Sequence, residues 1–182
     1  MPDQIIKNSR NKMEDTVQAL SKELSTIRTG RANPAILSGI LVEYYGVKTP
    51  LNQISQISVP EPQSLLIKPF DKTSLGGIEK AILESNVGLT PNNDGETIRL
   101  NIPALTAERR IELTKLVRKA AENSKISIRN IRRDANDELK KLTGIGEDDV
   151  KLYQDDVQEL TNEFTEKIDE VAKEKEDEVK TI

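Results

Sequence analysis

Basic residues concentrate between residues 105 and 141, where their chemistry suits the binding of phosphate groups. This stretch holds eleven basic and six acidic residues, a net charge of +5, in a chain whose overall charge is −4. A guanidinium group makes forked contacts with phosphate that an ammonium group cannot make. Only 3% of the residues are aromatic, which argues against stacking of single-stranded bases. The stretch therefore predicts contact with the backbone of folded RNA, and its candidate residues are Arg110, Arg118, Arg129, Arg132 and Arg133.

Most of these side chains, with two lysines, fall on one side of the helix that the stretch predicts. At 100° between successive residues, the apolar positions of this helix centre about 125° away from Arg118. A charged stripe on an exposed helix is usually a solvated face that nearby acidic residues such as Glu122 compensate. Phosphate binding and a solvated face therefore both stay open. The residues within about 60° of Arg118 are Lys125, Arg129, Arg132, Arg133 and Lys140.

The composition argues against an enzyme. The chain has no cysteine and no histidine, so the usual thiolate ligands, the cysteine nucleophile and the commonest general base are missing. No glycine-rich phosphate loop is present, and Gly76-Gly77 reads as the first turn of a short helix. Asp148, Asp149, Asp155 and Asp156 lack the spacing of a calcium loop. We expect no catalytic residue, no metal, no cofactor and no small-molecule substrate.

The hydropathy pattern argues against a membrane protein. No apolar run approaches the 18 residues or so that a spanning helix needs, and the first ten residues, MPDQIIKNSR, lack the apolar core of an export signal. We therefore expect a cytoplasmic protein.

Three long stretches have the periodicity of amphipathic helices. Apolar residues recur every three or four positions from Ile6 to Ile27, from Leu105 to Leu142 and from Val150 to Val179. Glycine and proline at Gly30, Pro34 and Gly144 mark helix ends. Because no such helix is stable alone, the three helices are expected to pack as one elongated bundle of residues 1–30 and 105–182.

Residues 31–104 predict a small, β-rich α+β domain inserted between the first and second long helices. Most prolines and glycines of the chain fall here, between short β-prone runs. A short helix starting at Thr73 or Ser74 carries Ile78 and Ile82. We expect strands at 39–45, 54–59, 64–68 and 96–102, and turns at 46–50, 60–63 and 92–95.

The chain must cross between the two expected domains twice, and the paired crossings predict a hinge. One crossing is Thr29, Gly30 and Arg31, and the other is Pro103, Ala104 and Leu105.

Long collinear strings of this chain resemble the bacterial ribosome recycling factors. Among them are Ile27-Arg28-Thr29-Gly30-Arg31-Ala32-Asn33-Pro34 and Ile128-Arg129-Asn130-Ile131-Arg132-Arg133-Asp134-Ala135-Asn136. Strings this long and in this order are far more specific than a short motif. The likeness covers nearly the whole chain, and its other strings are residues 42–46, 49–51, 103–110, 117–118, 147–149 and 154–161.

The resemblance implies an L-shaped, two-domain protein of about transfer-RNA dimensions. Its bundle would bind large-subunit ribosomal RNA, and elongation factor G with its GTP hydrolysis would help it to split the post-termination ribosome. By motif match, Arg110, Arg129 and Arg132 would be the main contacts with the RNA. Arg28 and Arg31 would add to them, and the stripe extends the set to Arg118, Lys125 and Arg133. We expect a monomer without a membrane partner.

Two other classes of protein remain as alternatives. A coiled-coil-like scaffold or holdase would present apolar grooves of the bundle to proteins, but it has no need of a basic stripe. A general binder of structured RNA would bind arbitrary duplexes with similar affinity.

Overall fold

The computed structural model describes residues 1–85 and 87–180 of the chain, which divides into two compact units. Of the described residues, one unit contains Met1–Arg28 and residues 106–180, and the other contains the described part of Thr29–Leu105. The expected α+β class, with long helices and a small β-containing unit, is confirmed. Within the described residues, no helix is apolar enough over a sufficient length to cross a membrane.

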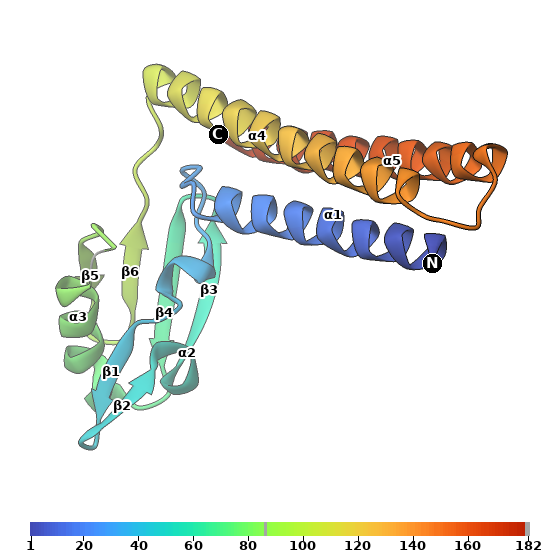
Figure 1. The fold of residues 1–182 in the computed structure, drawn as a ribbon. Helices are drawn as coiled ribbons and strands as arrows, with labels where there is room; N and C mark the ends of the chain where they lie inside the picture. The colour runs from blue at the N-terminus through green and yellow to red at the C-terminus, as the bar shows by residue number, and fades with distance from the viewer. Residues whose placement is uncertain (86, 181–182) are drawn as a thin grey trace. The chain divides into compact units, whose positions relative to one another are not determined.

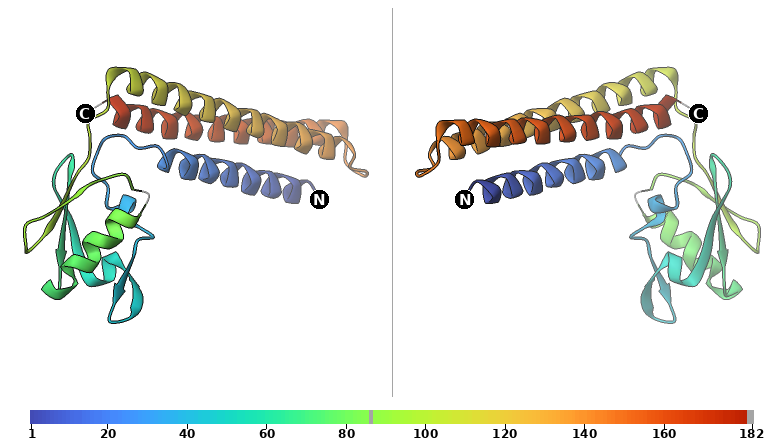
Figure 2. Two further views of the ribbon diagram at one scale, coloured as in Figure 1. Left: turned by 90° about the vertical axis from the view of Figure 1, so that its left-hand side faces the viewer. Right: turned by 90° about the vertical axis from the view of Figure 1, so that its right-hand side faces the viewer.

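The first unit consists of three long helices, and the sequence sets their ends. Helix α1 spans Pro2–Ser25, with a proline in its first turn. Helix α4 spans Ala107–Lys140, and its N-cap Thr106 accepts a hydrogen bond from the Arg109 amide at 3.1 Å. Helix α5 spans Glu147–Lys180 and begins with three acidic residues, which the helix dipole favours. Figures 1 and 2 show the three helices running alongside one another.

The three helices bury a continuous apolar core. Met13 and Leu20 of α1, Val117 and Ile128 of α4, and Phe164 of α5 are at most 1% exposed and belong to one cluster. A second, smaller cluster joins the start of α1 to the end of α4 and the first turns of α5. Each helix therefore buries the apolar stripe that its sequence period predicts.

The second unit combines a four-stranded antiparallel sheet, a separate hairpin and one longer helix. The sheet has the order β3-β4-β6-β5, and among the described residues β1 pairs only with β2. The elements are η1 (Pro34–Leu37), β1 (Leu41–Tyr44), β2 (Val47–Pro50), α2 (Leu51–Ile54), β3 (Ser55–Glu61), β4 (Ser64–Pro69), η2 (Lys72–Ser74), α3 (Leu75–Glu84), β5 (Pro91–Asn93) and β6 (Ile98–Asn101).

A separate apolar core holds the second unit together. Leu65 and Ile67 of β4 and Ile98 of β6 pack with Ile78 and Ile82 of α3, and all five are almost fully buried. The alternation of buried and exposed residues along β6 matches its period of two. Figure 2 shows α3 beside the strands that it covers.

The expected turn at 46–50 is wrong. The turn is restricted to Tyr45 and Gly46, whose φ angles of 48° and 77° suit the tight type I′ turn of a two-residue hairpin. Val47–Pro50 continues as strand β2 and pairs in register with Leu41–Tyr44. The turn expected at 92–95 is also partly wrong, because Pro91–Asn93 pairs with β6 as strand β5.

Candidate nucleic-acid interface

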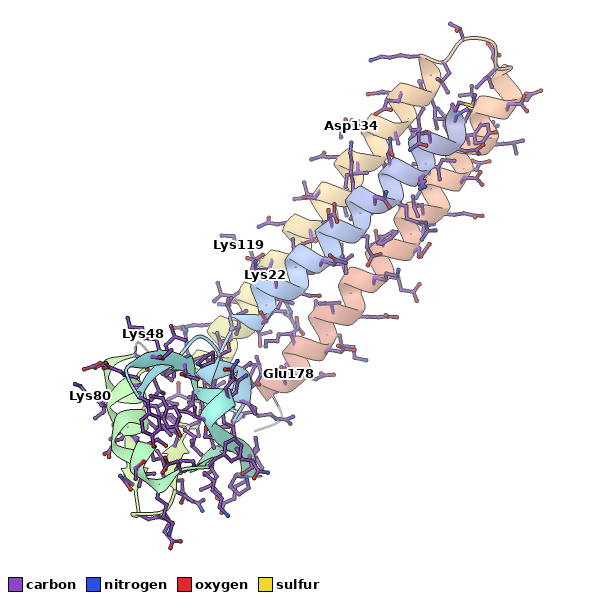
Figure 3. The ribbon with its side chains drawn as sticks, turned by 90° about the horizontal axis from the view of Figure 1, so that it is seen from below. Lys22, Lys48, Lys80, Lys119, Asp134 and Glu178 are labelled. Atoms are coloured by element: carbon purple, nitrogen blue, oxygen red, sulfur yellow. The ribbon has the colours of Figure 1, made fainter. Side chains whose placement is uncertain are left out.

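Most basic residues of the expected interface lie along α4, which its buried stripe holds in the bundle. Leu113, Val117, Ile128 and Leu139 on that stripe are 0–3% exposed. The opposite side of the helix faces solvent, and Figure 3 shows Lys119 and Asp134 projecting away from the bundle. The cations of α4 that the sequence analysis singles out are Arg110, Arg118, Lys125, Arg129, Arg132, Arg133 and Lys140.

Two of these cations are paired with carboxylates of the neighbouring helix. Arg118 Nε lies 2.9 Å from Glu176 Oε1, and Lys125 Nζ lies 2.5 Å from Asp169 Oδ1. The Glu176 side chain is only 17% exposed, whereas the Arg118 side chain is 67% exposed, so the carboxylate is shielded from water and the guanidinium group is not. Part of the positive charge on α4 is therefore balanced by α5. The angular positions of residues on α4 alone do not reveal these ion pairs with α5.

Arg129 has a weaker partner on its own helix. Its Nη1 atom lies 3.7 Å from Glu122 Oε1, and both side chains are more than half exposed. Such a pair contributes little in water and is screened by salt. Arg129 can therefore exchange this carboxylate for a phosphate at low cost.

Arg132 has an amide partner instead of a carboxylate. Its Nη1 donates a hydrogen bond to Gln158 Oε1 at 3.0 Å, and Gln158 Nε2 in turn donates to Asn162 Oδ1 at 3.0 Å. The Nε atom of Arg132 is buried and has no hydrogen-bond partner among the described residues. The guanidinium group of Arg132 therefore keeps its full charge while one of its edges is held.

Arg133 and Arg110 have different surroundings. The Arg133 side chain is exposed, and within the described part of the chain it takes part in no ion pair. Arg110 is half-buried in the first turns of α4. Helix geometry puts Arg110 about 80° from Arg118, toward the apolar side. Arg133 is thus the more accessible of the two, although both are candidates by sequence.

The remaining candidate residues lie outside the helices, at the two crossings. Arg28 and Arg31 are exposed in the segment between α1 and η1, and they belong to different units. Gly30, between them, has a φ of 78°, which favours glycine. The second crossing, Pro103, Ala104 and Leu105, joins β6 to the N-cap of α4. The structure therefore brings five of the eight RNA-contact candidates together on the exposed and α5-facing sides of α4.

Carboxylates with altered pKa values lie away from this row of cations. Hydrogen bonds from Arg10 hold the pKa of Glu163 below its usual value, and Lys167 adds to the effect. The Arg10 contacts are bidentate, both at 3.1 Å, and they join α1 to α5. Among the described residues, no group of acidic side chains has the arrangement of a metal site. The arrangement thus offers cations for anion binding, whereas Glu163 and Arg10 serve the packing of the bundle.

Comparison with known proteins identifies the family. The family model described as ribosome recycling factor matches residues 20–179. The chain belongs to the ribosome recycling factor family. The ribosome-recycling factor of Bacillus subtilis (strain 168) is 52% identical over 185 residues, with all of both chains covered. That of Leptospira biflexa serovar Patoc (strain Patoc 1 / Ames) is 53% identical over 183 residues, again with full coverage of both.

Solved structures of ribosome recycling factors share the fold. A solution structure of a ribosome recycling factor matches with a TM-score of 0.79 and 36% identity, covering 100% of this chain and 98% of the other. A second match has a TM-score of 0.63 and 42% identity, with 98% of both chains covered. It belongs to models for the T. thermophilus ribosome recycling factor and the E. coli elongation factor G bound to the E. coli post-termination complex.

Proposed function

We propose that this chain binds the post-termination ribosome and, together with elongation factor G, separates the subunits for reuse. The related T. thermophilus factor is described with elongation factor G on that complex, which supports the same partners here. GTP hydrolysis by the elongation factor supplies the energy, and the chain itself catalyses no reaction. It acts as a monomer in the cytoplasm, and it needs neither a cofactor nor a small-molecule substrate.

The row of cations on α4 supports contact with large-subunit ribosomal RNA. The proposed main contacts are Arg110, Arg129 and Arg132. The environment of Arg132 is the observation that carries the proposal. Its guanidinium group is held by a neutral amide at 3.0 Å, so the group retains a charge that a phosphate can satisfy. Arg28, Arg31, Arg118, Lys125 and Arg133 are proposed as additional contacts, of which Arg118 and Lys125 must first leave a carboxylate.

The two crossings support a hinge between the units. The proposed hinge has two connecting segments. One is Thr29, Gly30 and Arg31, and the other is Pro103, Ala104 and Leu105. Both crossings lie outside regular helices and strands, so they can change their dihedral angles without breaking a helix or a sheet. The bundle would stay bound to RNA while the partner factor moves the second unit.

A subunit-separation assay tests the proposal directly. Post-termination ribosomes are mixed with the chain, elongation factor G and GTP, and free subunits are measured by light scattering or on sucrose gradients. We expect separation only when all components are present. Intact ribosomes in the complete mixture would refute the proposal. A comparable affinity of the chain for an arbitrary RNA duplex would favour the general RNA binder instead.

A substitution at Gly30 tests the hinge. Proline fixes φ near −65°, which is incompatible with the observed 78°. We expect Gly30→Pro to leave binding to large subunits nearly unchanged and to impair their separation. Normal separation by this variant would show that the crossing need not bend, and Gly95→Pro in an exposed turn of the second unit is the matched control.

A further inference from the structure

The contacts between α4 and α5 repeat along one edge of the bundle. Arg118, Lys125 and Arg132 are seven residues apart on α4, so they lie in one row. Glu176 and Asp169, also seven residues apart, pair with Arg118 and Lys125 from the antiparallel α5. The next position in this α5 row is Asn162, which accepts a hydrogen bond from Gln158, the residue that reaches Arg132.

The α5 partner of Arg132 is neutral, whereas the α5 partners of Arg118 and Lys125 are carboxylates. Asn162 stands where the pattern would place a carboxylate, and Gln158, one helical turn away, reaches Arg132. Both of these partners are neutral amides. The chain has five basic and fourteen acidic residues after residue 141, so a neutral pair opposite an arginine stands out in this segment.

The amide pair holds one edge of the guanidinium group without neutralising it. Gln158 accepts from Arg132 Nη1 and is itself fixed by its bond to Asn162, both at 3.0 Å. Arg132 Nε is buried and has no hydrogen-bond partner among the described residues, so the bond to Gln158 is the hydrogen bond that orients the group. The remaining Nη hydrogens are left for an external acceptor, and a guanidinium group binds phosphate oxygens in this forked way.

We propose that Gln158, held by Asn162, is a positioning residue that aims the charged Arg132 guanidinium at a phosphate of structured RNA. This inference rests on the proposed function, because it names the residue that prepares the α4 contact for RNA. Gln158 does not touch the phosphate in this arrangement. Its part is to orient Arg132 before binding and to leave the charge of Arg132 uncompensated.

Gln158→Glu tests the proposal with almost no change of shape. The new carboxylate keeps the acceptor oxygen but pairs with Arg132, as Glu176 pairs with Arg118. Binding of the full chain to purified large ribosomal subunits is measured between about 50 and 200 mM salt. We expect affinity to fall about tenfold and the salt slope to decrease by about one, as for the loss of one phosphate contact.

Two further variants separate positioning from general charge and packing. Gln18→Glu, on the exposed side of α1, changes the net charge equally, and we expect less than about a twofold loss of affinity from it. Asn162→Asp places a carboxylate at the next position of the α5 row, beside Gln158, and it should weaken binding as Gln158→Glu does. Circular dichroism and thermal unfolding should remain those of the parent chain for all three variants.

A double-mutant cycle with Arg132→Ala shows whether Gln158 acts through Arg132. In the Arg132→Ala background, Gln158→Glu should have no more effect than the charge control. A Gln158→Glu variant that binds like the control, or that is equally harmful without Arg132, would overturn the positioning role. Failure of the parent chain to bind large subunits would instead refute the proposed function, so the two failures are distinguishable.

Discussion

Replacing Phe164 with alanine tests how the two units are stabilised. The Phe164 ring is 0% exposed and packs with residues such as Met13 and Val117 from the other two helices. Lys167 Nζ and Arg10 Cζ lie 4.5 and 5.7 Å from the ring centroid. Truncation of a buried phenylalanine and loss of two such cation–π contacts together should lower the free energy of unfolding of the bundle by about 4–6 kcal/mol.

The chain offers a separate optical probe for each unit. Helices α1, α4 and α5 have 24, 34 and 34 residues, against 4 and 10 in α2 and α3, so the circular dichroism at 222 nm reports the bundle. There is no tryptophan, and two of the three tyrosines, Tyr44 and Tyr45, lie in the second unit. Tyrosine fluorescence therefore reports mainly the second unit.

Guanidinium titrations of Phe164→Ala should move the two signals by different amounts. The apolar clusters of the two units share no residue, so the midpoint by circular dichroism should fall by roughly 1 M or more while the tyrosine midpoint stays in place. As a control, Ile111→Ala at a residue 58% exposed on α4 should change stability by less than about 0.5 kcal/mol. An equal shift of both signals, or a loss under about 1 kcal/mol, would refute this reasoning.

Three further predictions follow from local geometry. At both Gly46 and Gly76, an added Cβ atom would meet no neighbour, but Gly46 has a φ of 77°, which strains any residue with a side chain. Gly46→Ala should therefore lower the stability of the second unit by about 1 kcal/mol. Gly76→Ala, within helix α3, should raise it by about 0.5 kcal/mol, and tyrosine-detected unfolding measures both changes. Hydrogen bonds from the Thr97 and Glu96 amides lower the pKa of Asp94, so its contribution to stability is present above the unfolded value of about 3.9 and is lost as the pH falls through the folded pKa. Asp94→Asn should therefore flatten the fall in stability below about pH 4, and an unchanged pH profile would contradict the assignment. Asp169→Asn releases Lys125 on α4 from its ion pair. Binding to large subunits should then strengthen severalfold, and the salt slope of binding should steepen by up to about one. A weaker complex would show that Lys125 does not contact RNA.

The helices could be predicted from the sequence because their apolar spacing is a local property. The apolar spacing between Leu105 and Leu142 places Val117, Ile128 and Leu139 on one stripe of the helix, and all three are fully buried. The hairpin and the edge strand were harder. Gly46 and Pro50 resemble the two ends of a longer turn, although only Gly46 belongs to it. Strand β5 consists of a proline and two asparagines, which have little β-propensity, and it depends on its pairing with β6.

The candidate interface was only partly predictable, for a related reason. Helical periodicity placed Arg118, Lys125 and Arg132 on one side of their helix, but it carried no information on what α5 presents to them. Pairing with Glu176 and Asp169 depends on the register of the two helices, which joins residues far apart in the chain, 58 positions in the case of Arg118 and Glu176. The matching seven-residue spacing on both helices was the available signal. This spacing predicts the ion pairs once α4 and α5 are treated as an antiparallel pair.

The order of the elements along the chain has a consequence for synthesis on the ribosome. Helix α1 is made first, but its packing partners α4 and α5 begin only at Ala107 and Glu147. At roughly 5–20 residues per second, α1 waits several seconds for α4 and longer for α5. An isolated amphipathic helix is marginal in water, so its apolar stripe is without cover during this delay. The intervening residues 29–105 have their own apolar cluster and can complete their sheet in that time. During synthesis, the second unit can therefore fold first, and the three-helix bundle forms last, when α4 and α5 become available to pack against α1.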